Sequence, residues 1–384
     1  MKKDVFWNES IKVPFVLPEI TAHDKKVILK TLKNSLLTDG PKLQEFETKF
    51  AKFSGAKYAV GVSSATAGLH LSLNSLSIGK GDEVIIPDMT FVATANAVLL
   101  TGATPVIADV NMDNFCISVD SIKKSITKKT KAILPVHFAG SPCEMSKILS
   151  IAKKYSLKII EDCAHGIDAR IKRKHVGTFG DVGCFSFYPT KNITTFEGGM
   201  VITNSKKIVE YVKSARNHGI TRNLRDRFSR GKPWDYDVKY PGYNYRLDEI
   251  RSSLGINQLK RINHINSLRR KACEYYNSEL RKINGIVIPK YPTNQENGFH
   301  LYIIRIQKQF GLSRDKLFQK FLKSGIRTSV HYKPLHKFTA YKKMAKVYDR
   351  LDNSNRIYNE IITLPLFPQI SIKQQNAVIS NIIH

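Results

Sequence analysis

Three groups of residues in this sequence combine types and spacings that could carry out chemistry. One is the run Ser63-Ser64-Ala65-Thr66, which follows an apolar stretch and precedes a helical pattern. Free backbone N–H groups at a helix start bind phosphate well, although ordinary helix capping explains the same residues. Another is Asp162, which follows an apolar stretch and precedes His165. A carboxylate at the end of a buried parallel strand can pair with a cationic ligand, although it can equally cap the next turn.

The third group centres on Lys191, which follows a Tyr-Pro-Thr turn and precedes Gly198-Gly199. A lysine held in a desolvated cleft becomes a nucleophile, although a single lysine is more often solvated. It lies 29 residues after Asp162 (191 − 162). A phosphate cradle, a carboxylate and a lysine together suit pyridoxal phosphate. The phosphate of this cofactor needs donors, its ring nitrogen needs an acid, and its aldehyde needs an amine.

A fourth segment, residues 240–250, combines tyrosines with Asn244 and Arg246. These residue types can recognise an anion or a ring, and tyrosines that simply pack the start of a helix would give the same pattern. Residues 218–245 show little periodicity, and we interpret them as a long functional loop.

Alternating strands and helices are expected to position these groups. An α/β fold with a mostly parallel sheet, covered on both faces, follows from apolar strands separated by helices. The predicted strands are Tyr58–Val62, Glu83–Ile86, Thr104–Ala108, Ala132–Val136, Leu157–Glu161, Val182–Phe187 and Met200–Thr203. The predicted helices include Ala65–Ser75, Ala93–Leu100, Met145–Tyr155 and residues 206–217.

A long helical pattern from Asp248 to about Arg281, with a bend, is expected to lead into a smaller domain. That domain has a predicted strand at His300–Ile306, a helix at Ser313–Ser324 and a terminal helix after Ser371. We therefore predict a large cofactor-binding domain at residues 1–260, with an N-terminal helical segment, and a small α+β domain at residues 261–384.

Composition excludes several classes of protein. No apolar run approaches the ~18 residues of a membrane span, and no signal sequence is recognisable. Five cysteines without CxxC spacing predict neither a disulfide framework nor a metal site, and they fit a cytoplasmic location. The net charge of +29 is spread along the chain without a nucleic-acid motif. We therefore expect no nucleic-acid partner and no membrane partner.

Eight stretches, in order along nearly the whole chain, resemble the sugar-nucleotide aminotransferases of the DegT type, which have the aspartate-aminotransferase fold. The stretches are LLTDGPKLQEFETKFAKFSG, VSSATAGLHLSL, VIIPDMTFVATANAVLLTGATPVIADV, IIEDCAHG, GTFGDVGCFSFYPTKNITTFEGGMVIT, PGYNYRLDEIRSSLGINQL, SVHYKPLH and LPLFP. The resemblance implies a three-layer, fold type I pyridoxal-phosphate transferase.

The resemblance also implies roles for matching residues. Lys191 would hold the cofactor covalently and shuttle a proton, Asp162 would pair with the ring nitrogen, and His165 would lie beside the ring. These three are the catalytic residues that the resemblance implies. Asp162 would act through its charge, because a carboxylate beside the ring nitrogen favours the protonated form of that nitrogen. The implied cofactor-binding residues are Thr66, Ala67, Phe91, Asp162, His165, Ser186, Lys191 and Asn244.

Within that set, Phe91 matches the aromatic residue that stacks on the ring. Thr66 and Ala67, with Ser186, match the residues that hold the phosphate. Asn244 matches a phosphate contact from the neighbouring subunit, which implies a homodimer with shared active sites.

Three positions depart from the pattern of the family that this sequence resembles. Ala65, Phe196 and Asp168 stand where the family commonly has glycine. None of the three removes a chemical group that the implied mechanism needs. Phe196 is expected to narrow the site, since it lies close to the lysine in sequence.

The implied function is a pyridoxal-phosphate-dependent aminotransferase that converts a nucleotide-linked keto sugar, a 4-keto-6-deoxy sugar, to the amino sugar with L-glutamate as donor. The stretch SVHYKPLH resembles the members that aminate position 4. Arginines of the segment Lys213–Lys232, beginning with Arg216, could bind the diphosphate of the co-substrate or could be solvated.

Two alternatives to this function remain. One is a sugar 3-dehydratase of the same family, which carries histidine at the position of Lys191. The other is a non-catalytic regulatory or nucleic-acid-binding relative.

Overall fold

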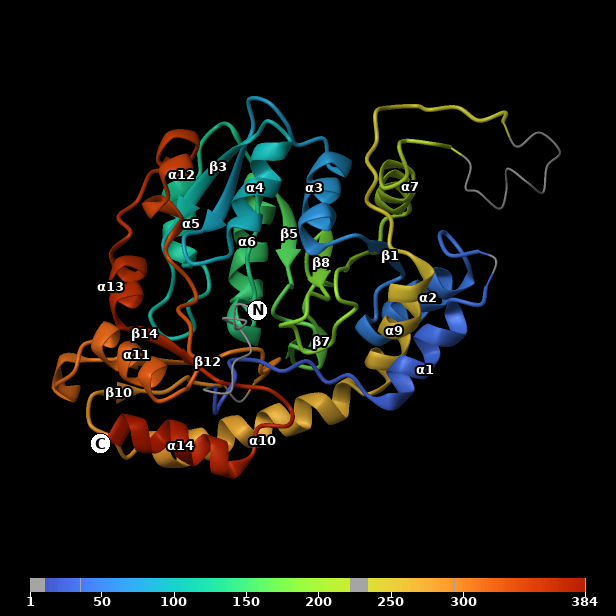
Figure 1. The fold of residues 1–384 in the computed structure, drawn as a ribbon. Coiled ribbons are helices and arrows are strands. Elements are labelled where there is room, and N and C mark those ends of the chain that lie inside the picture. The colour runs from blue at the N-terminus through green and yellow to red at the C-terminus, as the bar shows by residue number, and fades with distance from the viewer. Residues whose placement is uncertain (1–10, 35, 222–233, 293, 384) are drawn as a thin grey trace.

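The computed structural model describes residues 11–34, 36–221, 234–292 and 294–383. Its centre is an eight-stranded sheet with the strand order β1-β9-β8-β5-β4-β2-β3-β13 (Figure 1). The strands are β1 (Tyr58–Val62), β2 (Glu83–Pro87), β3 (Thr104–Ala108), β4 (Thr130–Ile133), β5 (Lys158–Asp162), β8 (Val182–Ser186), β9 (Gly199–Thr203) and β13 (Lys346–Val347). Only β9 runs antiparallel to its neighbours, so the predicted mostly parallel sheet is confirmed.

Strand periodicity explains why helices cover both faces of this sheet. Successive residues of a strand point to opposite faces. Ile86 accordingly packs with the core under α3 (Ala65–Ser75), α4 (Val92–Leu100) and α7 (Lys206–Ala215). The preceding residue, Ile85, packs with α5 (Val119–Ser125) and α6 (Met145–Tyr155) on the other face. The α/β class and its three layers are therefore confirmed.

Two N-terminal helices, α1 (Ala22–Thr31) and α2 (Pro41–Ser54), pack against α9 (Glu249–Lys260). The N-cap of α2 is Gly40, which has no side chain to cap the helix. The Glu249 carboxylate takes that role and accepts hydrogen bonds from the N–H groups of Gly40, Lys42 and Leu43 at 2.8–3.1 Å. A carboxylate is also favourable at the positive end of the helix dipole.

The predicted bend in the long helical pattern lies at Arg261, between α9 and α10 (Ile262–Leu280). Arg261 pairs with Asp24 of α1 at 2.8 Å and with Glu19, so the break is fixed by ion pairs. It coincides with the predicted boundary at residue 260. The division into two domains itself stays a prediction. Leu301 and Ile303, at the start of β12, pack into a core that also contains residues of the large sheet.

The C-terminal part holds a second, antiparallel sheet of β10 (Ile286–Val287), β12 (Tyr302–Ile306) and β14 (Ile361–Leu364). The long helix α10 and α14 (Ile372–Ile383) lie side by side along its outer side (Figure 1). The remaining elements are β6 (Arg170–Ile171), β7 (Lys174–His175), β11 (Gln295–Glu296), α11 (Arg314–Lys323), α12 (Thr339–Met344), α13 (Asp352–Glu360), η1 (Phe138–Gly140), η2 (Lys308–Phe310) and η3 (Leu335–Lys337). Among the helices described, none has the length and apolar character that crossing a bilayer requires.

Candidate active site

A cavity of about 480 Å³ lies at the carboxyl ends of the central strands. Asp162 is the last residue of β5, Ser186 is the last residue of β8, and Lys191 follows in the next loop. Ligands of open α/β sheets bind at this edge. The structure brings six predicted residues together in the cavity wall, which are Thr66, Phe91, Asp162, His165, Ser186 and Lys191. Two predicted residues do not line it: Ala67 is buried behind the start of α3, and Asn244 is exposed.

The start of α3 forms the polar end of this cavity. Ser64 is the N-cap, and its Oγ accepts a hydrogen bond from the Ala67 N–H at 3.1 Å. Gly199 allows β9 to approach this turn, because a Cβ at position 199 would lie 2.6 Å from the Ser64 carbonyl oxygen. The hydroxyl of Thr66 and the helix N-terminus together suit a phosphate group.

Asp162 is 4% exposed, and two donors hold its carboxylate in place. Oδ1 accepts a hydrogen bond from the Ala164 N–H at 3.0 Å, and Oδ2 accepts one from the Thr94 hydroxyl at 2.9 Å. Burial raises the pKa of Asp162, while these two hydrogen bonds and the Lys191 charge oppose that rise. The result is an oriented carboxylate in the cavity wall, suited to a cationic partner.

His165 lies beside this carboxylate as a neutral imidazole. Its Nδ1 accepts a hydrogen bond from the Ala139 N–H at 3.3 Å, and its Nε2 lies 3.2 Å from the Tyr332 hydroxyl. An acceptor at Nδ1 places the single proton of the neutral ring on Nε2. Burial, and next the nearby charges of Lys191 and His331, hold the pKa of His165 well below its usual value.

Lys191 is the cation of the cavity wall among the described residues. Burial lowers the pKa of Lys191 from 10.5 to about 8, and the carboxylate of Asp162 opposes that decrease. At neutral pH a larger share of its amine is therefore unprotonated than on the protein surface. An unprotonated amine is the nucleophilic form, so the site activates this lysine.

Several wall residues were not identified from the sequence. Thr94 orients Asp162, and His331 and Tyr332 reach the cavity from the C-terminal part of the chain. Phe91, which was identified from the sequence, is the N-cap of α4 and is 56% exposed. The centre of its ring lies 5.9 Å from the centre of the Tyr332 ring. His331 and Tyr332 belong to the stretch SVHYKPLH, which was singled out from the sequence. The stretch alone does not show that these two residues reach the cavity.

A buried group next to the site, His137, Glu161 and Cys163, has ligand atoms within 4.8 Å of one another. The Glu161 carboxylate, however, accepts hydrogen bonds from the N–H groups of Gly177, Phe179 and Gly180 at 2.7–2.8 Å. It also lies 2.9 Å from His137 Nε2. These bonds occupy the carboxylate oxygens, so the group is explained as a clamp on the loop at residues 177–180 without a cation.

Arg216, suggested from the sequence as a diphosphate contact, has a different place. It is 6% exposed, and its guanidinium donates to Glu47 at 2.6 Å and to the Gly61 carbonyl at 2.5 Å. That interpretation is wrong for Arg216, because a buried ion pair already uses its donors. The other arginines of that segment lie outside the described residues.

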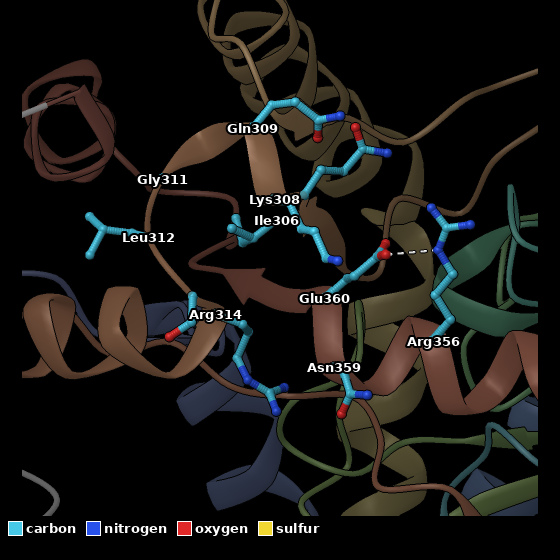
Figure 2. A pocket seen from close by; sticks show the side chains of 11 residues that line it. Ile306, Lys308, Gln309, Gly311, Leu312, Arg314, Arg356, Asn359 and Glu360 are labelled. Atoms are coloured by element: carbon cyan, nitrogen blue, oxygen red, sulfur yellow. Dashed lines mark hydrogen bonds and ion pairs between the residues drawn. The ribbon is translucent and has the colours of Figure 1, made fainter.

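A larger, open hollow of about 720 Å³ lies between β12, α11 and α13 (Figure 2). It shares no lining residue with the cavity at Lys191. Its Arg356 side chain is paired with Glu360 at 2.9 Å, and Arg314 donates to the Ile361 carbonyl. We therefore place the chemistry in the cavity at Lys191.

The sequence matches one family over most of its length. The model of the DegT/DnrJ/EryC1/StrS aminotransferase family matches residues 18–383. The spore coat polysaccharide biosynthesis protein SpsC of Bacillus subtilis (strain 168) is 36% identical over 363 residues, which cover 94% of this chain and 93% of SpsC.

Solved structures give the same result. Spr1654 from Streptococcus pneumoniae in its PMP form superposes with a TM-score of 0.90 and 30% identity, over 97% of this chain and 98% of Spr1654. PseC of Helicobacter pylori, an aminotransferase involved in the biosynthesis of pseudoaminic acid, superposes with a TM-score of 0.89 and 30% identity. That match covers 97% of this chain and 98% of PseC.

Proposed function

This chain belongs to the DegT/DnrJ/EryC1/StrS aminotransferase family, and we propose that it uses pyridoxal phosphate to transfer the amino group of L-glutamate to a nucleotide-linked keto sugar. One observation carries the proposal: Lys191, Asp162 and the start of α3 line a single cavity of about 480 Å³. The enzyme is an aminotransferase of the sugar class, like its relatives. The cofactor, the donor and the nucleotide are the parts that we propose.

The cavity fits the cofactor chemically at four points. Thr66 and Ser186, with the N-terminus of α3, would hold the phosphate, and Phe91 would cover the ring. The oriented carboxylate of Asp162 would pair with the ring nitrogen, and Lys191 would hold the aldehyde carbon covalently. The PLP and PMP forms in which Spr1654 has been solved support this assignment. When bound, pyridoxal phosphate supplies an aldehyde that accepts an amino group and a ring that withdraws electrons.

The residues of this chain would then perform three tasks. Lys191 Nζ, unprotonated in part because its pKa is near 8, would remove the proton from the donor carbon in the first half of the reaction and would deliver a proton to the sugar carbon in the second half. Asp162 would keep positive charge on the ring nitrogen. His165, neutral and fixed by Ala139 and Tyr332, would orient the ring without adding a second positive charge.

Charge supports a shared site. The proposed substrates carry a diphosphate and two carboxylates, yet Lys191 is the cation among the described residues of the cavity wall. We infer that a second subunit contributes further positive charge to the site. Asn244 is exposed and does not line the cavity of its own chain, as expected of a residue that contributes to a partner's site. We therefore propose a homodimer with shared active sites.

The resemblance also bears on the position that is aminated and on the type of reaction. The stretch that contains His331 and Tyr332 favours amination at position 4 of a 4-keto-6-deoxy sugar, by resemblance. The sugar 3-dehydratase alternative is disfavoured, because lysine and not histidine occupies position 191.

The decisive experiment is a screen of purified enzyme with L-glutamate against a panel of nucleotide-linked 4-keto and 3-keto sugars. The expected result is an amino sugar and 2-oxoglutarate in equal amounts. Borohydride reduction of the loaded enzyme, followed by peptide mapping, should find the cofactor on Lys191. Deoxygenated sugar without amination would support the dehydratase, and a label on another lysine would overturn the site.

A further inference from the structure

A half-buried carboxylate, Asp168, is linked through two buried amide side chains, Asn266 and Asn192, to the loop that carries Lys191. Asp168 Oδ2 accepts a hydrogen bond from Asn266 Nδ2 at 2.9 Å. Asn266 Oδ1 accepts one from Asn192 Nδ2 at 2.6 Å, and the same Asn192 nitrogen donates to the Gly298 carbonyl at 2.6 Å. Asn192 is 6% exposed and Asn266 is 7% exposed. We refer to Asp168, Asn266 and Asn192 as the polar relay.

The direction of the relay is fixed by its ends. An ionised carboxylate can only accept, so Asn266 must present its amide nitrogen to Asp168. That orientation turns Asn266 Oδ1 toward Asn192, whose nitrogen must then donate. A backbone carbonyl, that of Gly298, also only accepts, so it selects the same orientation from the other end. Without an acceptor at position 168, the Asn266 amide would keep its bond from Asn192 and lose the bond to Asp168, which is one of the two that orient it.

The relay acts on the backbone next to Lys191. Lys191 lines both the cavity of about 480 Å³ and a second, small cavity of about 30 Å³, which His300 and His331 also line. Because the lysine borders two cavities, we infer that the direction of its side chain depends on how its backbone is held. Asn192 provides that hold, because its amide ties the lysine loop to α10 and to Gly298.

The bond from Asn192 to the Gly298 carbonyl also holds the segment that leads to His300. Gly298 N–H donates to the Gly140 carbonyl at 2.9 Å, and two residues later the His300 ring lies 4.5 Å from the His165 ring. The relay thus lies between the lysine loop and the segment that supports His165.

We propose that Asp168 is a positioning residue for Lys191 and acts through Asn266 and Asn192. The inference rests on the proposed role of Lys191. The carboxylate gives the relay an oriented end that accepts a hydrogen bond.

The test compares Asp168→Leu, which removes the acceptor, with Asp168→Asn, whose amide oxygen can still accept from Asn266. We expect Asp168→Leu to lower kcat about tenfold with KM changed less than about twofold, since small misplacements of a reacting group are costly. We expect Asp168→Asn to stay within about threefold of wild type. Asp181→Leu is the matched control, since Asp181 instead accepts from the Ile159 N–H at the far end of β5.

Two readouts separate positioning from stability. The first is the rate at which cofactor-free protein captures pyridoxal phosphate at Lys191, fixed with borohydride. The second is the pH midpoint of the absorption band of the loaded enzyme. Asp168→Leu should change both, and Asp181→Leu should change only the unfolding temperature. If Asp168→Leu lowers the unfolding temperature but leaves both readouts at the wild-type values, the proposal is wrong.

A double variant tests the route. If the effect of Asp168 passes through Asn192, adding Asp168→Leu to Asn192→Ala should lower kcat little below that of Asn192→Ala alone. A kcat of the double variant that equals the product of the two single losses would overturn the relay. Failure of the proposed function can be told apart from failure of the relay, since wild-type protein would in that case form no bond at Lys191 that borohydride can fix.

Discussion

Lys191 in the cofactor-free protein should titrate near pH 8, and Asp162→Asn should move that midpoint lower. The pKa falls from 10.5 to about 8 because burial disfavours the charged amine. At pH 7 the unprotonated fraction is then about 9%, against about 0.03% for an amine with an unperturbed pKa, which is about 300-fold more nucleophile. The Asp162 carboxylate favours the ammonium form, so replacing it with a neutral amide removes the opposing effect and lowers the pKa of Lys191 further.

Trace acetylation measures this directly. Cofactor-free protein is treated with a small amount of acetic anhydride between pH 6 and pH 11, and the labelled peptides are quantified by mass spectrometry. Solvated lysines in the same digest provide the reference, since their amines ordinarily titrate near ~10.4. The matched control is Asp181→Asn, a carboxylate-to-amide change in the loop before β8 rather than in the cavity wall.

The sign of the shift decides the outcome. A Lys191 midpoint near that of the solvated lysines would refute the argument that burial activates the amine. A midpoint that rises in Asp162→Asn would refute the argument that the two groups interact as opposite charges. An equal shift in Asp181→Asn would show that the change is not specific to the site.

Three further changes test other parts of the structure. Asp162→Asn should lower turnover at least ~10²-fold in a steady-state transamination assay, as removal of preorganised electrostatic partners does, and near-wild-type turnover would exclude the role. Inactive Lys191→Ala and an impaired Asn244→Ala should regain activity when their subunits are mixed, and tagged mixed dimers without activity would contradict the shared site. Arg216→Met should destabilise the fold by about 3 kcal/mol in urea unfolding, because it removes the closer of the two cations that pair with the buried Glu47 carboxylate, and an unchanged midpoint would contradict that ion pair.

Much of the sheet domain was predictable because its signals are local. The helix at Ala65–Ser75 is capped by Ser64, and the helix at Met145–Tyr155 ends at Ser156 in the left-handed conformation. The strand predicted at Ala132–Val136 ends earlier, at Ile133, because Pro135 has no N–H to continue the ladder. Leu134 still donates to the Ile85 carbonyl at 2.8 Å, and Val136 forms an isolated parallel bridge with Asp162. Apolar runs and caps lie within a few residues of one another, so a sequence shows them directly.

Contacts between distant parts of the chain could not be predicted in this way. Strand β13 has two exposed residues, Lys346 and Val347, and no apolar run, yet it pairs with β3 at the edge of the large sheet. The sequence around Arg216 predicts an arginine in a loop. Arg216 instead forms a buried ion pair, because Glu47 of α2 lies next to it in the fold. In both cases the partner lies more than a hundred residues away in the sequence, and no local pattern identifies it.

The division of labour between Glu161 and Asp162 shows how the fold assigns chemistry to neighbouring residues. Both are carboxylates at the end of β5, but the pleat of a strand points them to opposite faces. On one face Glu161 meets three backbone N–H groups and His137, which use its oxygens for structure. On the other face Asp162 has two donors and an open cavity, so its negative charge remains available to a cation. A shift of one residue in the pairing of β5 would exchange these faces. The loop clamp at Glu161 therefore holds the register on which the placement of Asp162 opposite Lys191 depends.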